Sequence, residues 1–141
     1  MARWATQGLS RRPGSSAEAL RVFERKYKVQ MPEDLRELLM VADGMEEMDT
    51  ANQIRLWSLQ EIAPVSEAAP ELASDRYAGY FVFADHCLWS MAYGIYLAAA
   101  PAVVVVAGGP GPIAVTSSFS SFLELYLDDS AGLFPSPPKG G

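Results

Sequence analysis

The sequence has 141 residues, of which 17 are Asp or Glu and 11 are Lys or Arg, giving a formal net charge of −6 and an isoelectric point near 4.7. Hydrophobic residues make up 50% and charged residues 20%, which is typical of a globular domain and argues against intrinsic disorder. The acidic balance argues against a nucleic-acid-binding protein, because such proteins usually carry a basic face.

No apolar run reaches the roughly 18–20 residues that a membrane-spanning helix needs. Asp85, His86, Ser90 and Pro101 interrupt the longest one. The positively charged N-terminus is not followed by the apolar segment of a secretory signal. One cysteine excludes an internal disulfide. We therefore expect a cytoplasmic protein that does not bind membranes.

The N-terminal third predicts a flexible arm over residues 1–14 and then two amphipathic helices. Ser15 and Glu18 have the spacing of a capping box, which predicts a helix from Ala17 to about Tyr27. Pro32 is suited to the first turn of the second helix, and Gly44 to its C-terminal end. The buried stripes are expected to be Leu20, Phe23 and Tyr27 in the first helix and Leu35, Leu38, Leu39 and Ala42 in the second.

The next segment predicts loops and short elements. An acidic loop over residues 45–53 leads to a short strand over 54–57. Ser58 and Glu61 again have capping-box spacing, for a one-turn helix that ends before Pro64. Residues 64–79 are rich in Pro, Ala, Ser and acidic residues, so we expect a long surface connection.

The most apolar stretch, residues 80–106, predicts the centre of a β-sheet. Residues 80–83 and 103–106 are rich in β-formers, and residues 88–97 alternate between large and small side chains. Because side chains alternate across a strand, this sheet should have one bulky face and one closely approached face. The large residues are Trp89, Met91, Tyr93, Ile95 and Leu97, and the small ones are Ser90, Ala92 and Gly94.

The C-terminal part predicts a Gly/Pro turn over residues 108–112, a strand over 113–115, and a helix capped by Ser118. Residues 136–141 form a Pro/Gly-rich tail that we expect to be disordered. Because helices cluster at the two ends, the order indicates a single α+β domain over residues 15–135. Its fold class is a two-layer one, a mainly antiparallel sheet with N-terminal and C-terminal helices packed on it.

No catalytic, metal-binding or cofactor-binding motif is present. The glycine cluster at 108–111 lacks the ending of a phosphate loop, and its prolines remove backbone donors. His86 and Cys87 are the only residues of their types, too few for a zinc site, and adjacent strand residues point to opposite faces. We therefore expect no enzyme, no metal and no cofactor.

An ordered set of motifs resembles the SUKH superfamily, which includes the domain of fungal cell-wall-synthesis regulators of the Smi/Knr type. The N-terminal motifs are Ala19–Phe23–Glu24–Tyr27, Met31-Pro32-Glu33-Asp34-Leu35 with Leu38-Leu39, and Asp43-Gly44. The later ones are Ile54-Arg55-Leu56-Trp57, Phe81 to Asp85, and Ser118-Phe119 with Phe122-Leu123 and Tyr126-Leu127. The likeness extends from about residue 13 to 135. Met31 replaces the usual Leu and Asp43 the commoner Asn.

The resemblance implies an α+β fold without shared catalytic residues. Many bacterial members are similar to immunity proteins, which bind and neutralise a cognate toxin, often a nuclease. Other members are regulatory domains that bind an endogenous protein. The resemblance thus leaves two functions open, toxin immunity and a regulatory or scaffold role.

Two long connections carry carboxylates that a protein partner could contact. They are Glu46, Glu47 and Asp49 in the first and Glu67, Glu71 and Asp75 in the second. A nuclease needs a basic channel to hold phosphates, so acidic loops could occupy it and speed association. The alternative is that these carboxylates only keep the loops solvated.

Overall fold

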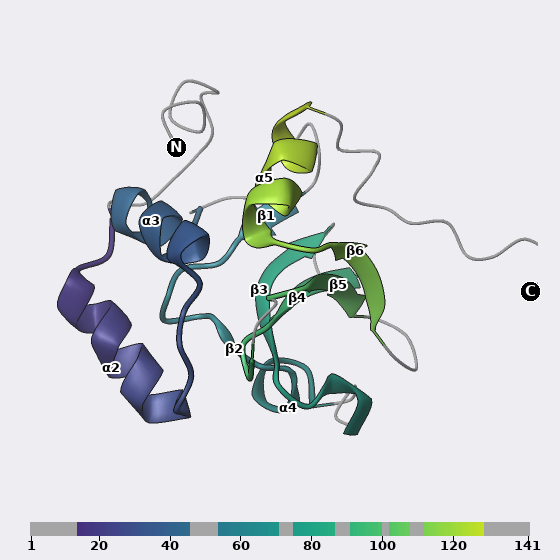
Figure 1. The fold of residues 1–141 in the computed structure, drawn as a ribbon, viewed down its shortest axis with the longest axis horizontal. Coiled ribbons are helices and arrows are strands. Elements are labelled where there is room, and N and C mark those ends of the chain that lie inside the picture. The colour runs from purple at the N-terminus through teal and green to yellow at the C-terminus, as the bar shows by residue number, and fades with distance from the viewer. Residues whose placement is uncertain are drawn as a thin grey trace, which may run out of the picture.

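Six antiparallel strands and the helices packed on them form the protein, seen as a ribbon in a computed structural model (Figure 1). The structure describes residues 14–45, 54–70, 75–86, 91–99, 102–107 and 112–128. The helical elements are α2 (Ala17–Tyr27), α3 (Glu33–Val41), α4 (Val65–Ala68), the 3-10 turn η2 (Asp75–Tyr77) and α5 (Phe119–Asp128). The strands are β1 (Ile54–Leu56), β2 (Ala63–Pro64), β3 (Tyr80–His86), β4 (Met91–Tyr96), β5 (Val104–Ala107) and β6 (Ile113–Thr116).

The strand order is β1-β3-β4-β5-β6, and β2 also pairs with β3. Every pairing is antiparallel, and β3 to β6 follow one another along the chain as a meander. The register of the central hairpin sets Tyr80 opposite Tyr96 and His86 opposite Met91. The predicted α+β class with a mainly antiparallel sheet is therefore confirmed.

The alternation in β4 gives the predicted bulky face, but the predicted close approach on the other face is not seen at Gly94. The Tyr93 ring lies 5.1 Å from the Phe122 ring of α5, so the bulky face is turned toward the helix. On the other face, a Cβ added at Gly94 would lie 3.4 Å from the Phe81 carbonyl oxygen and 3.7 Å from Val105. These are ordinary van der Waals distances to neighbouring strands, so no close approach at Gly94 requires the small residue there.

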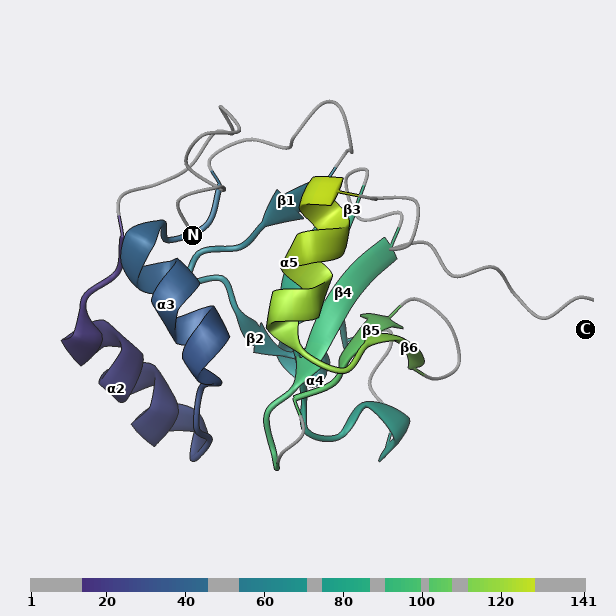
Figure 2. The same ribbon diagram turned by 45° about the horizontal axis from the view of Figure 1, so that its top comes forward.

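The helices α2, α3 and α5 form the second layer. Figures 1 and 2 both place α5 over the sheet, with α2 and α3 together at one side. Phe122 of α5 and Phe23 of α2 pack against two residues of β3, with ring centroids 5.1 Å from Phe83 and 5.8 Å from Phe81. None of the described helices is long and apolar enough to cross a membrane.

Helix α2 has the predicted bounds, Ala17–Tyr27, but its capping serine differs by one residue from the prediction. Ser16, not Ser15, is the N-cap, and its hydroxyl oxygen accepts a hydrogen bond from the Ala19 amide at 3.1 Å. The Ser15 amide instead donates to the Leu39 carbonyl at 2.7 Å, which ties the start of α2 to α3. Glu18 lies in the first turn of the helix and forms ion pairs with Arg21 and Arg25 instead of completing a capping box with Ser15.

The predicted role of Gly44 as a helix end was wrong. Helix α3 ends at Val41, and its C-cap Ala42 is extended. Gly44 has φ of +80°, and a Cβ there would lie 2.4 Å from the Ser58 nitrogen and 2.5 Å from the Trp57 carbonyl carbon. Glycine is therefore required because two backbone segments meet at this point.

The second capping box forms only in part. The Ser58 amide donates to Oε1 of Glu61 at 3.0 Å, but the buried Ser58 hydroxyl has no hydrogen-bond partner among the described residues. Residues 59–61 form a turn rather than the predicted one-turn helix. A short helix, α4, instead begins directly after Pro64. The cap of the last helix is confirmed, because the Ser121 amide donates to Oγ of Ser118 at 3.1 Å.

Candidate functional site

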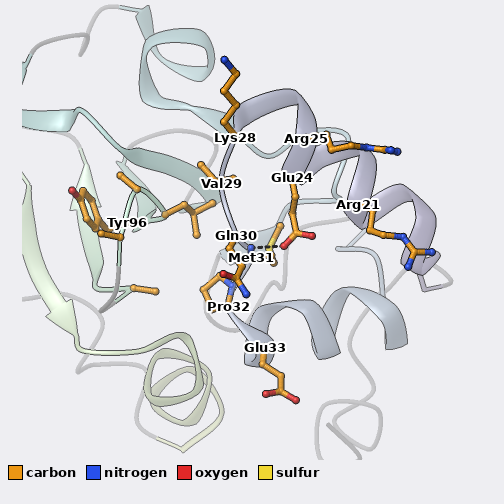
Figure 3. A pocket seen from close by; sticks show the side chains of 14 residues that line it. Arg21, Glu24, Arg25, Lys28, Val29, Gln30, Met31, Pro32, Glu33 and Tyr96 are labelled. Carbon is orange, nitrogen blue, oxygen red and sulfur yellow. Dashed lines mark hydrogen bonds between the residues drawn. The ribbon is translucent and has the colours of Figure 1, made fainter.

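A groove with a volume of about 830 Å³ runs between helix α2, the α2–α3 connection and the segment that follows β4 (Figure 3). We call it the α2 groove. Its lining residues are Arg21, Glu24, Arg25, Lys28, Val29, Gln30, Met31, Pro32, Glu33, Tyr96, Leu97, Ala98, Ala99 and Ala102. Binding sites for small ligands have volumes of about 300–1,000 Å³, so this groove is large enough to hold a ligand or a short peptide segment.

One wall of the groove is the polar face of α2. Arg21, Glu24, Arg25 and Lys28 follow the i, i+3, i+4, i+7 spacing that brings side chains to one face of a helix. The buried positions Leu20 and Phe23 lie on the other side of the helix and pack into the core. The burial of that apolar face fixes the direction in which the charged face points.

The floor is apolar and rigidly packed. Met31 and Leu97 line the groove and are only 2% and 5% exposed. Val29 and Ala102 lie beside them and pack partly against the core. An occupant would therefore meet mainly the partly buried Val29 and Ala102, with charged side chains on the α2 side of the groove only.

Glu24 lines the groove but is already bound by the protein. Its Oε2 accepts hydrogen bonds from the Met31 amide at 2.7 Å and from the Arg36 guanidinium at 2.6 Å, as Figure 3 shows for Met31. Burial alone would raise the pKa of Glu24, but the bonds from Arg36 and Met31 outweigh it and lower that pKa. The carboxylate stays ionised and holds the α2–α3 connection in place.

The cations on the rim are exposed and only partly neutralised. Arg21 and Arg25 share one carboxylate, that of Glu18, at 3.4 and 3.3 Å, and their side chains are 63% and 72% exposed. Ion pairs this exposed contribute little to stability and exchange readily. Lys28 has a left-handed backbone with φ of +56° as the C-cap of α2, and it forms no ion pair with any described residue.

A second polar cluster lies away from the groove, between β1, β3 and the turn after β1. Arg55 forms a bidentate ion pair with Glu61: its Nη1 donates to Oε1 at 3.0 Å and its Nη2 to Oε2 at 2.7 Å. Burial would raise the pKa of Glu61, but the bonds from Arg55 and Ser58 lower it to about 2. Asp85 is 4% exposed and accepts a hydrogen bond from the Trp57 indole at 2.7 Å. These groups connect strands, which gives them a structural role.

The predicted contact residues are only partly within the described chain. Glu67 in α4 is exposed, and its Oε1 accepts a hydrogen bond from the Tyr27 hydroxyl at 3.3 Å. Asp75 begins η2 and is also exposed. Neither of them lines the α2 groove. The remaining predicted residues lie outside the described residues: Glu46, Glu47, Asp49 and Glu71.

Other features noted in the sequence also lie outside the described residues. These are the arm before Gly14, Cys87, Trp89, the glycine cluster at 108–111 and the tail, together with the side chain of His86. Within the described ranges, no group of three or more His, Cys, Asp or Glu residues has the arrangement to hold a metal ion.

The α2 groove is not among the sites predicted from the sequence. The i, i+3, i+4, i+7 spacing of Arg21, Glu24, Arg25 and Lys28 was a usable signal for a common face. The spacing alone does not predict which other segment of the chain lies across from this face of the helix. Only the folded chain shows that the segment after β4, with Leu97 and Ala102, forms the facing wall and floor.

Comparison with known proteins gives one family match. The model of the SMI1 / KNR4 family (SUKH-1) matches residues 14–125, which includes every strand of the sheet and the lining of the groove. No curated protein matches the sequence.

Proposed function

The chain belongs to the SMI1 / KNR4 family (SUKH-1), and from this premise we propose that it is a non-catalytic immunity protein that binds and neutralises a bacterial toxin. The family match is the observation that carries the proposal. The protein would act in the cytoplasm, where the toxin would otherwise act on its target. It would bind the toxin directly and would need no cofactor.

The ionisable groups with shifted pKa values are bound within the chain or packed in its core, which supports a non-catalytic role. A catalytic acid or base needs a pKa near the working pH and a place beside the substrate. Glu24 and Glu61 have lowered pKa values, and each carboxylate is bound to an arginine of the same chain. Burial raises the pKa of the Tyr93 phenol, which packs under α5 in the core. These groups stabilise the fold.

The composition of the α2 groove supports a protein partner. Protein interfaces combine an apolar centre with a polar rim. The groove has this arrangement, with the partly buried Val29 and Ala102 among its apolar lining and Arg21, Arg25 and Lys28 at the rim. Glu67 and Asp75 are each exposed outside the groove, and such carboxylates would suit the basic channel of a nuclease.

Co-expression tests this function. The candidate toxin is a toxin domain encoded beside this gene, produced in a bacterial host with and without the protein. We expect the host to survive only when the protein is present, and the two proteins to purify as a complex. A gene neighbourhood without toxin or secretion genes, together with no protection, would contradict the proposal. Recovery of a housekeeping protein from native lysate would instead support the regulatory role.

A further inference from the structure

We propose that the α2 groove binds an acidic segment of the partner protein that also carries apolar residues. Carboxylates of the segment would pair with Arg21, Arg25 and Lys28, and its apolar side chains would lie over Val29 and Ala102, which line the groove above the buried Met31 and Leu97. This inference rests on the proposed protein-binding function and adds the chemistry and the place of the contact.

The distribution of charge gives the first argument. The whole chain has a formal charge of −6, yet five of the seven Lys and Arg residues in the described ranges lie between positions 21 and 36. They are Arg21, Arg25, Lys26, Lys28 and Arg36. Arg36 lies in α3 and is paired with Glu24, but α2 with its C-cap carries four cations against the two carboxylates Glu18 and Glu24, so this helix is locally basic on an acidic protein. An acidic partner segment would be attracted to this helix and repelled by most of the remaining surface.

The pairing of these cations gives the second argument. Glu24 cannot neutralise the rim, because its carboxylate is held by Arg36 and the Met31 amide. Among the described residues, Glu18 is the single carboxylate within ion-pair distance of Arg21 and Arg25. Figure 3 places Glu33 at the opposite end of the groove from Lys28. The rim therefore keeps a surplus of positive charge that faces solvent.

The shape of the groove gives the third argument. It is bounded by a helix on one side and by the segment after β4 on the other, with an apolar floor between them. In an extended segment, alternate side chains point to opposite sides. Apolar residues could therefore contact the floor while the acidic residues between them reach the rim. A nucleic acid would meet the same cations, but the net charge of −6 opposes its approach.

A labelled peptide of alternating glutamate and leucine tests this inference, with binding followed by fluorescence anisotropy. The matched comparison is Arg25→Glu against Lys26→Glu. Both residues are exposed on α2, but only Arg25 lines the groove, because the Lys26 ammonium lies over the Tyr27 ring. We expect Arg25→Glu to weaken binding about tenfold and Lys26→Glu to change it less than about twofold. Lys28→Gln should weaken binding in the same direction, which gives a second variant if Arg25→Glu does not fold.

Several outcomes would overturn the inference. They are no saturable binding of the glutamate–leucine peptide, equal losses in the two α2 variants, or tighter binding of a lysine–leucine peptide or a single-stranded DNA probe. The toxin assay separates this inference from the proposed function. If wild-type protein protects the host and the Arg25→Glu/Lys28→Gln double variant protects equally well, the groove assignment fails while the immunity function stands. If wild-type protein binds the peptide but protects against no toxin, the immunity function fails and the groove assignment stands.

Discussion

The indole nitrogen of Trp57 donates a hydrogen bond of 2.7 Å to Oδ2 of Asp85, across the pair formed by β1 and β3. The same carboxylate oxygen lies 3.8 Å from Nε of Arg55. At 4% exposure, Asp85 is one of two buried polar residues among the described part of the chain. An unpaired carboxylate buried to this extent would be costly, so its partners explain how it is tolerated.

Replacement of Asp85 should therefore destabilise the fold. We expect Asp85→Ala to lower the free energy of unfolding by about 2–3 kcal/mol, because the Trp57 bond and the charge opposite Arg55 are lost together. Asp85→Asn keeps an oxygen acceptor and should cost less, about 1 kcal/mol. Urea denaturation followed by tryptophan fluorescence measures both. Equal effects of the two variants would show that the Trp57 hydrogen bond contributes nothing measurable.

Gly44 should tolerate alanine much less well than Gly94. At Gly44 the new Cβ would lie 2.4 Å from a backbone nitrogen, and φ is +80°, so we expect a loss of more than about 2 kcal/mol. At Gly94 the nearest atom would be 3.4 Å away and φ is not in the left-handed region, so the cost should stay below about 1 kcal/mol. Thermal unfolding of both variants checks this order. A Gly44→Ala protein as stable as Gly94→Ala would contradict it.

The Glu61–Arg55 ion pair predicts a loss of stability in acid. The pKa of Glu61 falls from an ordinary 4.5 to about 2 in the folded protein, so its contribution is complete above 4.5 and disappears as the pH falls toward 2. Because the Glu61 side chain is 35% exposed, solvent screening reduces the contribution to about 1–2 kcal/mol. Urea denaturation at a series of pH values should show a smaller acid-induced loss for Glu61→Gln than for the wild type. Parallel pH profiles would refute this.

The proposed acidic contact predicts a salt-dependent association rate. Glu67→Lys with Asp75→Lys reverses two exposed charges outside the α2 groove. If the toxin is a nuclease with a basic channel, the association rate should fall about tenfold at low salt and converge with the wild type at high salt. Surface plasmon resonance with the toxin domain measures this rate. An unchanged rate at low salt would mean that these two carboxylates only solvate their segments.

Much of the fold could be predicted because its elements follow from local patterns. The alternation around Tyr93 identifies the bulky face of the sheet, and in the structure that face contacts Phe122 of α5, the helix predicted after Ser118. The cap of α2 was displaced by one residue because Ser15 and Ser16 are both suitable caps in sequence. The tertiary bond from the Ser15 amide to Leu39 decides between them.

The sites could be predicted much less well, because they depend on contacts between distant segments. In the sequence, Asp85 is one of the polar residues that interrupt the longest apolar run. No pattern in the neighbouring residues indicates that Trp57 lies beside it in the fold. Gly44 has a local explanation as a helix end, but its actual reason is the approach of Trp57 and Ser58. The α2 groove likewise depends on Leu97, which is far from α2 in sequence and close to it only after folding.

The most direct test of a non-catalytic, toxin-binding function is a titration of toxin activity with purified protein. Direct binding predicts that activity falls linearly with added protein, reaches its minimum near equimolar amounts and does not decrease further with time. Size-exclusion chromatography should then recover the toxin intact and bound. Time-dependent inactivation by much less than an equimolar amount, with a covalently altered toxin, would show that the protein is an enzyme and would contradict the account.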